Sequence, residues 1–186
     1  MKNVIASLVE LLDSSTVLLG TDISEKYHSD WSGAAPCQPL ALLKPKNTQQ
    51  LSDIMALCHE HNQPVVIQGG LTGLAGGATP QSGEIAISLE RMNGIEELDA
   101  TAMTVTALAG TPLQVLQDAA DDSQLFLPLD LGARGSCNIG GNVATNAGGT
   151  EVIRYGMTRS LVLGLEAVLA DGTVINAMNK MVKNNS

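Results

Sequence analysis

Aromatic residues, basic residues and long apolar runs are all scarce in this 186-residue chain. Only 2% of the residues are aromatic, so a hydrophobic core has to be built from aliphatic side chains and methionine. Lysine and arginine number 10 against 19 aspartates and glutamates, and the net charge of −9 would repel a phosphate backbone, so we expect no nucleic-acid partner. No apolar run approaches the roughly 20 residues that span a bilayer, so we expect no transmembrane segment.

Cysteine is also rare, and its spacing excludes the common metal and disulfide patterns. Cys37, Cys58 and Cys137 are odd in number and form no CxxC pair, which is typical of a reduced protein and leads us to expect a cytoplasmic location. His59 and His61 are two residues apart and cannot face one metal from the same side of a helix. We therefore expect no metal site.

Charged residues make up only 16% of the chain and hydrophobic residues 44%, which excludes a disordered protein. At the N-terminus, Glu10 and Asp13 interrupt an apolar segment, which predicts an amphipathic helix rather than a secretory signal. A polar arm containing Trp31 follows this helix.

Strand and helix signals alternate in the first half of the chain. Segments 39–44, 64–68 and 84–89 are apolar and predict strands. Asn47 precedes a helix with Gln50 three residues later, the spacing of a capping box. One face of that helix is apolar and should be buried: Leu51, Ile54, Met55 and Cys58. This order predicts a small parallel sheet with a right-handed crossover.

The second half has a different pattern. Segment 104–107 alternates like a half-buried strand, and Thr111 with Pro112 predicts the start of a helix that runs to about Asp121. A strand is predicted over 161–170, followed by a hairpin turn at Asp171-Gly172.

The predicted fold class is therefore α+β, with a small βαβ parallel-sheet lobe and a larger, mostly antiparallel lobe with helices. We expect three regions: an N-terminal helix and arm (1–35), the βαβ lobe (36–98) and the second lobe (99–186).

Glycine is abundant, and 12 of the 19 glycines lie in segments 69–83 and 132–149. Such density costs backbone entropy on folding, so a functional reason is expected. The first segment, QGGLTGLAGG, follows a predicted strand but contains no lysine and no GxGxxG, which excludes a P-loop and disfavours a nicotinamide-type turn. What remains is a neutral loop whose backbone N–H groups can converge on an anion, with the Thr72 hydroxyl as a possible extra donor.

The second segment mixes glycines with short polar side chains, and it could lie along a long, polar-rimmed ligand. For either segment alone, a turn-rich surface loop is an equally good interpretation. Two such segments in two lobes favour a cofactor clamped between them.

Three runs carry a family resemblance: PVVIQGGLTGLAGGATP, PLDLGARGSCNIGGNVATNAGG and RYGMTRSLVLGLEAVLADGTVI. Together they resemble the FAD-binding domain of the vanillyl-alcohol-oxidase superfamily, a domain also named after p-cresol methylhydroxylase. The resemblance covers roughly residues 36 to 183 and is strongest to the branch of D-lactate and D-2-hydroxyglutarate dehydrogenases.

The resemblance implies that FAD is the cofactor, with its diphosphate on segment 69–77, its remaining length along 136–146 and its adenosine end near Ile175. The cofactor-binding residues that it implies are Gly69, Gly70, Leu71, Thr72, Gly73, Leu74, Gly76, Gly77, Pro128, Gly132, Ser136, Cys137, Asn138, Gly141, Asn142, Ala144, Thr145, Asn146 and Ile175.

Two positions depart from the family pattern. The family usually has a third consecutive glycine where this chain has Leu71. Members that bond FAD covalently often have histidine at the position of Thr72, so we expect FAD to be bound non-covalently here.

Family enzymes continue beyond this point with a further flavin-site strand and a cap domain. We therefore expect the chain to be the N-terminal FAD-binding portion of a flavin-dependent enzyme that dehydrogenates a small D-2-hydroxy acid. No general base is evident in this sequence, the catalytic residues and the electron acceptor are unknown, and we expect the chain alone to be inactive. The alternatives are a non-catalytic FAD-binding module or flavin subunit, an enolpyruvyl-sugar reductase and a molybdenum-hydroxylase flavin subunit, and the NIGGNVATNAGG run favours the hydroxy-acid branch over the last two.

Overall fold

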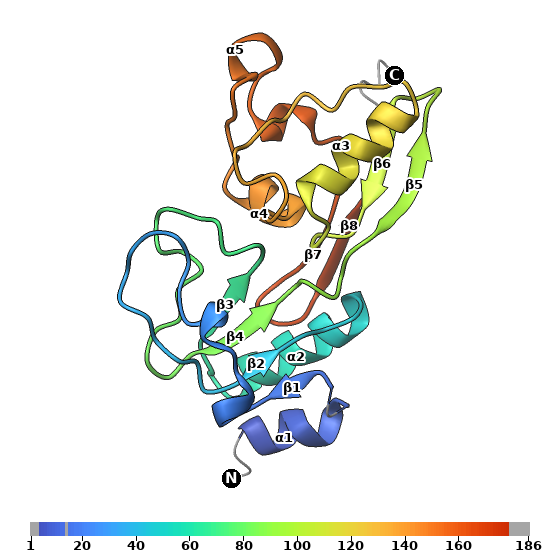
Figure 1. The fold of residues 1–186 in the computed structure, drawn as a ribbon. Coiled ribbons are helices and arrows are strands. Elements are labelled where there is room, and N and C mark those ends of the chain that lie inside the picture. Colours follow the sequence, from blue (N-terminus) through green and yellow to red (C-terminus); the bar gives the residue numbers. More distant parts are fainter. Residues whose placement is uncertain (1–3, 14, 179–186) are drawn as a thin grey trace.

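A four-stranded sheet forms the first of two lobes in the structure, a computed structural model that describes residues 4–13 and 15–178 (Figure 1). Its strand order is β1-β2-β4-β3. Strand β1 pairs antiparallel with β2, whereas β2 and β3 both run parallel to β4, as the strand–helix–strand pattern predicted. The strands are β1 (Val17–Leu18), β2 (Leu42–Leu43), β3 (Val65–Gln68) and β4 (Ile85–Ser88).

Helix α2 (Thr48–Glu60) connects β2 to β3, and its start confirms the predicted cap. The Asn47 side chain accepts a hydrogen bond of 2.9 Å from the backbone N–H of Gln50, and the Gln50 side chain accepts one of 2.8 Å from the N–H of Lys46. The buried face is also as predicted, with Ile54 and Cys58 fully enclosed. Local capping and amphipathic spacing thus fix this helix.

The two faces of the first sheet are covered by different parts of the chain. Helix α1 (Val4–Leu11), the expected N-terminal helix, packs with α2 on the face of Leu43, Ile85 and Ile87. The opposite face holds Leu42, Val66 and Ala86, which pack against Ile23 and Tyr27 of the arm. This arm contains the 3-10 helices η1 (Gly20–Asp22) and η2 (Glu25–Tyr27), and it completes the core of the first lobe.

The second lobe contains two separate antiparallel hairpins, which confirms its expected antiparallel character. One hairpin joins β5 (Ile95–Asp99) to β6 (Thr104–Ala107), and the other joins β7 (Leu165–Val168) to β8 (Val174–Ala177) across the predicted turn. Its helical elements are α3 (Leu113–Asp122), α4 (Ile139–Ala144), α5 (Val152–Tyr155) and η3 (Thr158–Leu161). Its small core is centred on Leu113, Leu129 and Cys137.

Two local predictions for this lobe are wrong. Thr111 does not cap α3, because Pro112 occupies the cap position and the buried Thr111 hydroxyl instead donates to the carbonyl of Leu108 at 2.7 Å. The strand predicted over 161–170 is confined to β7, because Leu161 is the last residue of η3 and residues 162–164 form no regular structure.

The lobes are joined where the β7–β8 turn packs against α2. The Ser52 hydroxyl donates to the carbonyl of Gly172 at 2.6 Å, and the Thr48 hydroxyl donates to Glu166 at 2.6 Å. Gly172 has a φ of +86°, and a Cβ atom there would lie 2.6 Å from the Ser52 carbonyl oxygen. Glycine is therefore required at this joint. Within the described residues, no helix is long and apolar enough to cross a membrane.

Candidate functional site

The two glycine-rich segments, one from each lobe, meet directly after β3. A Cβ atom on Gly70 would lie only 1.9 Å from the carbonyl oxygen of Ser136 and 2.8 Å from the Cα of Cys137. A Cβ atom on Gly69 would lie 3.4 Å from the side-chain oxygen of Asn138. Only glycine allows the two backbones to come this close.

The first segment leaves a run of backbone donors unused. It connects two neighbouring parallel strands, β3 and β4, without a helix. Within the described part of the chain, no acceptor receives a hydrogen bond from the N–H groups of residues 69–77. Consecutive free N–H groups in a glycine-rich loop are a recurrent means of binding an anion.

The ends of this loop are held by the side chain of Gln68. Its amide nitrogen donates to the carbonyl of Tyr27 at 2.9 Å and to the carbonyl of Ala78 at 2.9 Å, which ties the two ends of the loop together and to the arm. Gln68 is fully buried, and among the described residues its side-chain oxygen has no hydrogen-bond partner.

Asp30 of the arm holds the far end of the same loop. Its carboxylate accepts hydrogen bonds from the Ala78 N–H at 3.3 Å, the Thr79 hydroxyl at 3.1 Å and the Ser32 N–H at 3.0 Å. Burial alone would raise the pKa of Asp30, but hydrogen bonds from Ser32, Ala78 and Thr79 outweigh it and lower the pKa. Asp30 is therefore a buried carboxylate at neutral pH. Figure 1 shows the arm after β1 beside the loop after β3.

Leu71 has a left-handed backbone, with a φ of +58°. A left-handed backbone favours glycine, and the resemblance implies a further glycine at this position. The Leu71 side chain packs against the core formed by the arm and the sheet, which offsets part of the strain.

The second segment differs from the first because many of its backbone groups are already bonded. The N–H groups of Ile139 and Gly140 donate to the carbonyls of Thr111 and Ala109, and the side-chain nitrogen of Asn138 donates to the carbonyl of Gly110. Helix α4, which the sequence did not predict, then begins inside the segment. This segment therefore offers a fixed surface rather than a set of free amides.

The other predicted site residues occupy several environments. Gly73 and Gly76 approach the side chains of Asp30 and Ser32, and Leu74 is 77% exposed on the loop. Ile175, by contrast, pairs with Ala167 in the β7–β8 hairpin, and no described contact joins it to either glycine segment. Thr72 and Gly77 lie in the first segment. The other predicted residues lie in or beside the second segment, some exposed and some enclosed: Pro128, Gly132, Gly141, Asn142, Ala144, Thr145 and Asn146.

Sequence reasoning missed Gln68 and Asp30, which hold the ends of the loop. Gln68 carried a signal, because it is a polar residue at the buried end of an otherwise apolar strand. Asp30 carried none, because its partners lie 48 and 49 residues further along the chain.

A charged cluster anchors the arm next to this site. Glu90 accepts a hydrogen bond from the Tyr27 hydroxyl at 2.7 Å and forms ion pairs with Lys44 at 2.7 Å and Lys26 at 3.2 Å. Burial opposes ionisation of Glu90, but these three partners outweigh it and lower its pKa to about 2. Both lysine ammonium groups also lie over the Tyr27 ring, so the position of Tyr27 is fixed by several contacts.

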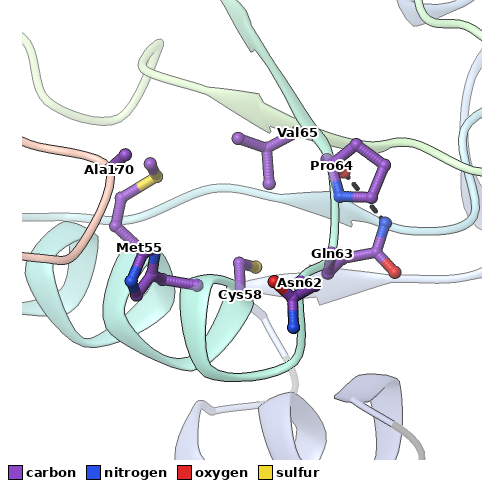
Figure 2. A pocket seen from close by; sticks show the side chains of 8 residues that line it. Met55, Cys58, Asn62, Gln63, Pro64, Val65 and Ala170 are labelled. Atoms are coloured by element: carbon purple, nitrogen blue, oxygen red, sulfur yellow. Dashed lines mark hydrogen bonds between the residues drawn. The ribbon is translucent and has the colours of Figure 1, made fainter.

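A separate pocket lies at the other end of β3, between the last turn of α2 and Ala170 (Figure 2). Met55, Cys58 and Val65 are among the residues that line it. None of its lining residues is a predicted cofactor-binding residue. Burial raises the pKa of the Cys58 thiol to about 11, so the thiol is protonated at neutral pH and unsuited to nucleophilic chemistry.

Comparison with solved structures supports the fold. A structure of alkyldihydroxyacetonephosphate synthase matches 96% of the chain with a TM-score of 0.84, at 17% identity, and the match covers 36% of that protein. At this identity the likeness concerns the fold.

Comparison with curated sequences gives nearer relatives. D-2-hydroxyglutarate dehydrogenases from Bos taurus (mitochondrial) and Xanthomonas citri pv. viticola are 45% and 43% identical over 162 residues, or 87% of this chain. The matches cover 30% and 34% of those proteins, so the chain spans about a third of their length.

These relatives overturn the expected cytoplasmic location. The Bos taurus relative is named as a mitochondrial protein, and so is a Danio rerio relative that is 43% identical over 89% of the chain and is matched over 31% of its own length. Unpaired cysteines indicate a reducing environment but do not distinguish one such compartment from another.

The glycine segments, β3 and the β7–β8 hairpin all fall within residues 39–178, which match the family described as "FAD binding domain". This match covers well over half of the chain. The chain belongs to this family of FAD-binding domains, and its cofactor is FAD.

Proposed function

We propose that the chain binds FAD non-covalently between its two lobes, as the FAD-binding portion of a flavin-dependent D-2-hydroxy-acid dehydrogenase. The observation that carries this proposal is the contact of the glycine segments at Gly70 and Ser136, next to nine consecutive backbone N–H groups that no described residue accepts. A diphosphate needs several donors, and these amides supply them without adding cationic side chains to an acidic protein.

The two segments are proposed to bind different parts of FAD. Residues 69–77 would hold the diphosphate, and the surface of residues 136–146, fixed to residues 109–111, would orient the rest of the cofactor. Ile175 is proposed for the adenosine end, on the resemblance alone. FAD would accept a hydride equivalent from the substrate, while the protein supplies binding, orientation and electrostatics.

The substrate class comes from the relatives, which are named D-2-hydroxyglutarate dehydrogenases. The 45% identity over 87% of this chain supports a small D-2-hydroxy acid as the substrate of the whole protein.

The cofactor site is tested by titrating the purified chain with FAD and following flavin and Trp31 fluorescence, since Trp31 is the single tryptophan. We expect saturable binding of FAD and release of intact FAD on acid precipitation, as non-covalent binding requires. Gly70→Ala should abolish binding, because its Cβ would overlap Ser136. Gly135→Ala is the matched control, because a Cβ there meets nothing within 4 Å and Gly135 is not among the implied cofactor-binding residues.

Dye reduction by the FAD-loaded chain with D-2-hydroxyglutarate and D-lactate tests the activity separately. We expect no turnover by the 186-residue chain, and we expect a longer protein containing it to oxidise at least one of these acids. Failure of that longer protein with both acids would reject the substrate class but leave the FAD site standing.

A further inference from the structure

Asp30 is a buried charged side chain that contacts the end of the cofactor loop but is not one of the residues implied to bind FAD. It is only 8% exposed, and its partners Ala78 and Thr79 belong to the end of the cofactor loop. The backbone N–H of Asp30 also donates to the Thr79 hydroxyl at 3.0 Å. Asp30 and Thr79 are therefore linked twice, by a main-chain and a side-chain contact.

These contacts fix the loop without using its free donors. Gln68 ties the start of the loop to Ala78, and Asp30 binds Ala78 and Thr79 from the arm. The N–H groups of residues 69–77 lie between these two attachments, and none of them donates to an acceptor among the residues that the structure describes. The arm thus restrains the loop from the side of the core.

The charge of Asp30 would by itself oppose an anionic ligand. One of its carboxylate oxygens lies 3.6 Å from the position of a Cβ on Gly73, in the middle of the loop. However, its oxygens already accept hydrogen bonds from Ser32, Ala78 and Thr79, and these donors offset its charge locally. The two effects therefore predict opposite results of removing Asp30. Loss of the restraint would weaken FAD binding, whereas loss of the repulsion would strengthen it.

We propose that Asp30 is a positioning residue that holds the glycine loop of residues 69–77 in its FAD-binding arrangement before FAD arrives. This inference rests on the proposed function. The restraint dominates over the repulsion because three donors, two of them from the end of the loop, converge on one buried carboxylate.

The first test compares FAD affinity among Asp30→Ala, Asp30→Asn and the wild-type chain. Asp30→Ala should weaken FAD binding at least tenfold. Asp30→Asn keeps one acceptor oxygen and should restore part of the affinity. Asp22→Ala is the matched control, because it removes an arm carboxylate from an exposed position in η1 and should change affinity less than twofold.

The second test needs no FAD. Leu74 is exposed on the loop, and thermolysin cleaves before such residues. Asp30→Ala should be cut at Gly73–Leu74 at least five times faster than the wild type and Asp22→Ala. Ile54→Val, a core change distant from the loop, controls for general loss of stability and should leave this cleavage unchanged at a temperature where all the variants are folded.

The outcomes separate the inference from the proposed function. Unchanged or tighter FAD binding by Asp30→Ala, with cleavage like the wild type, would overturn the positioning role. If Asp30→Ala does not fold, the same comparison is decided by Asp30→Asn. If the wild-type chain does not bind FAD, the proposed function fails, and the cleavage rates alone decide whether Asp30 restrains the loop.

Discussion

The strands of the two lobes are paired in opposite environments, buried in the first lobe and exposed in the β7–β8 hairpin of the second. All four residues of β4 are buried between β2 and β3, whereas all four residues of β8 are exposed although β8 is fully paired with β7. The first sheet is covered on one face by α1 and α2 and on the other by the arm. In the second lobe, the buried core lies instead around Leu113, Leu129 and Cys137.

This difference shows that hydrogen-bonded pairing and stability are separate properties of a sheet. Backbone pairing exchanges hydrogen bonds with water for hydrogen bonds within the protein, and its net gain is small. Apolar burial supplies most of the stabilisation. The first lobe should therefore respond strongly to changes in its strands, and the β7–β8 hairpin weakly.

The largest effect should come from truncating a leucine in the first sheet. Leu43→Ala in β2 removes a fully buried side chain and should lower the free energy of unfolding by about 2–5 kcal/mol. Leu165→Ala in β7 is the matched change at a residue that is 48% exposed, and it should cost less than about 1 kcal/mol. Urea unfolding followed by circular dichroism measures both, and equal losses would contradict the contrast between the lobes.

The joint between the lobes should be the next most sensitive point. Gly172→Ala combines a positive φ with overlap of Ser52 and Ala56, and it should cost about 1–3 kcal/mol. Gly135→Ala serves as control, because a Cβ there meets nothing within 4 Å. A thermal melt of each variant gives the comparison, and a normal melt for Gly172→Ala would show that the joint does not contribute to stability.

Acid should destabilise the first lobe through Glu90. Its pKa is about 2 in the folded chain, against an ordinary value of 4.5, so the unfolded chain takes up this proton first as the pH falls. The stabilisation is complete above about pH 4.5 and is lost progressively as the pH falls towards 2. Glu90→Gln should flatten this part of the profile of unfolding free energy against pH, and Glu60→Gln, an exposed change at the end of α2, should leave it unchanged.

Leu71→Gly should have the smallest effect. Relief of the left-handed backbone would gain about 1–2 kcal/mol. Loss of a partly buried leucine forfeits part of the roughly 1.5–3 kcal/mol that full burial provides. The two terms nearly cancel, so we expect a net change within about 1 kcal/mol by urea unfolding. A larger loss would mean that Leu71 is a main attachment of the arm.

The elements that the sequence predicted are those with local signals. The cap at Asn47, the buried face of α2 and the Asp171-Gly172 turn each depend on residues within a few positions of one another. Helix α4 was missed because it has only six residues and includes Gly140 and Gly141, which are poor helix formers. Its position is set by contacts with residues 109–111, and such contacts leave no periodic pattern.

The candidate site likewise combines features with a local sequence signal and features set by distant contacts. The glycine segments were evident from composition, and the structure brings them together at Gly70 and Ser136. The arm was expected to be a separate region, yet it covers one face of the sheet and contributes Asp30 to the loop. No spacing rule connects residues 48 positions apart, so this part required the three-dimensional structure.

The contact of Gly172 with Ser52 also has a consequence for synthesis of the chain on the ribosome. The two residues are 120 positions apart, whereas the first sheet is complete once β4 has emerged at Ser88. N-terminal units generally fold first during translation. The first lobe can therefore form while the rest is still being translated, and the joint between α2 and the β7–β8 turn can form only when that turn has left the exit tunnel.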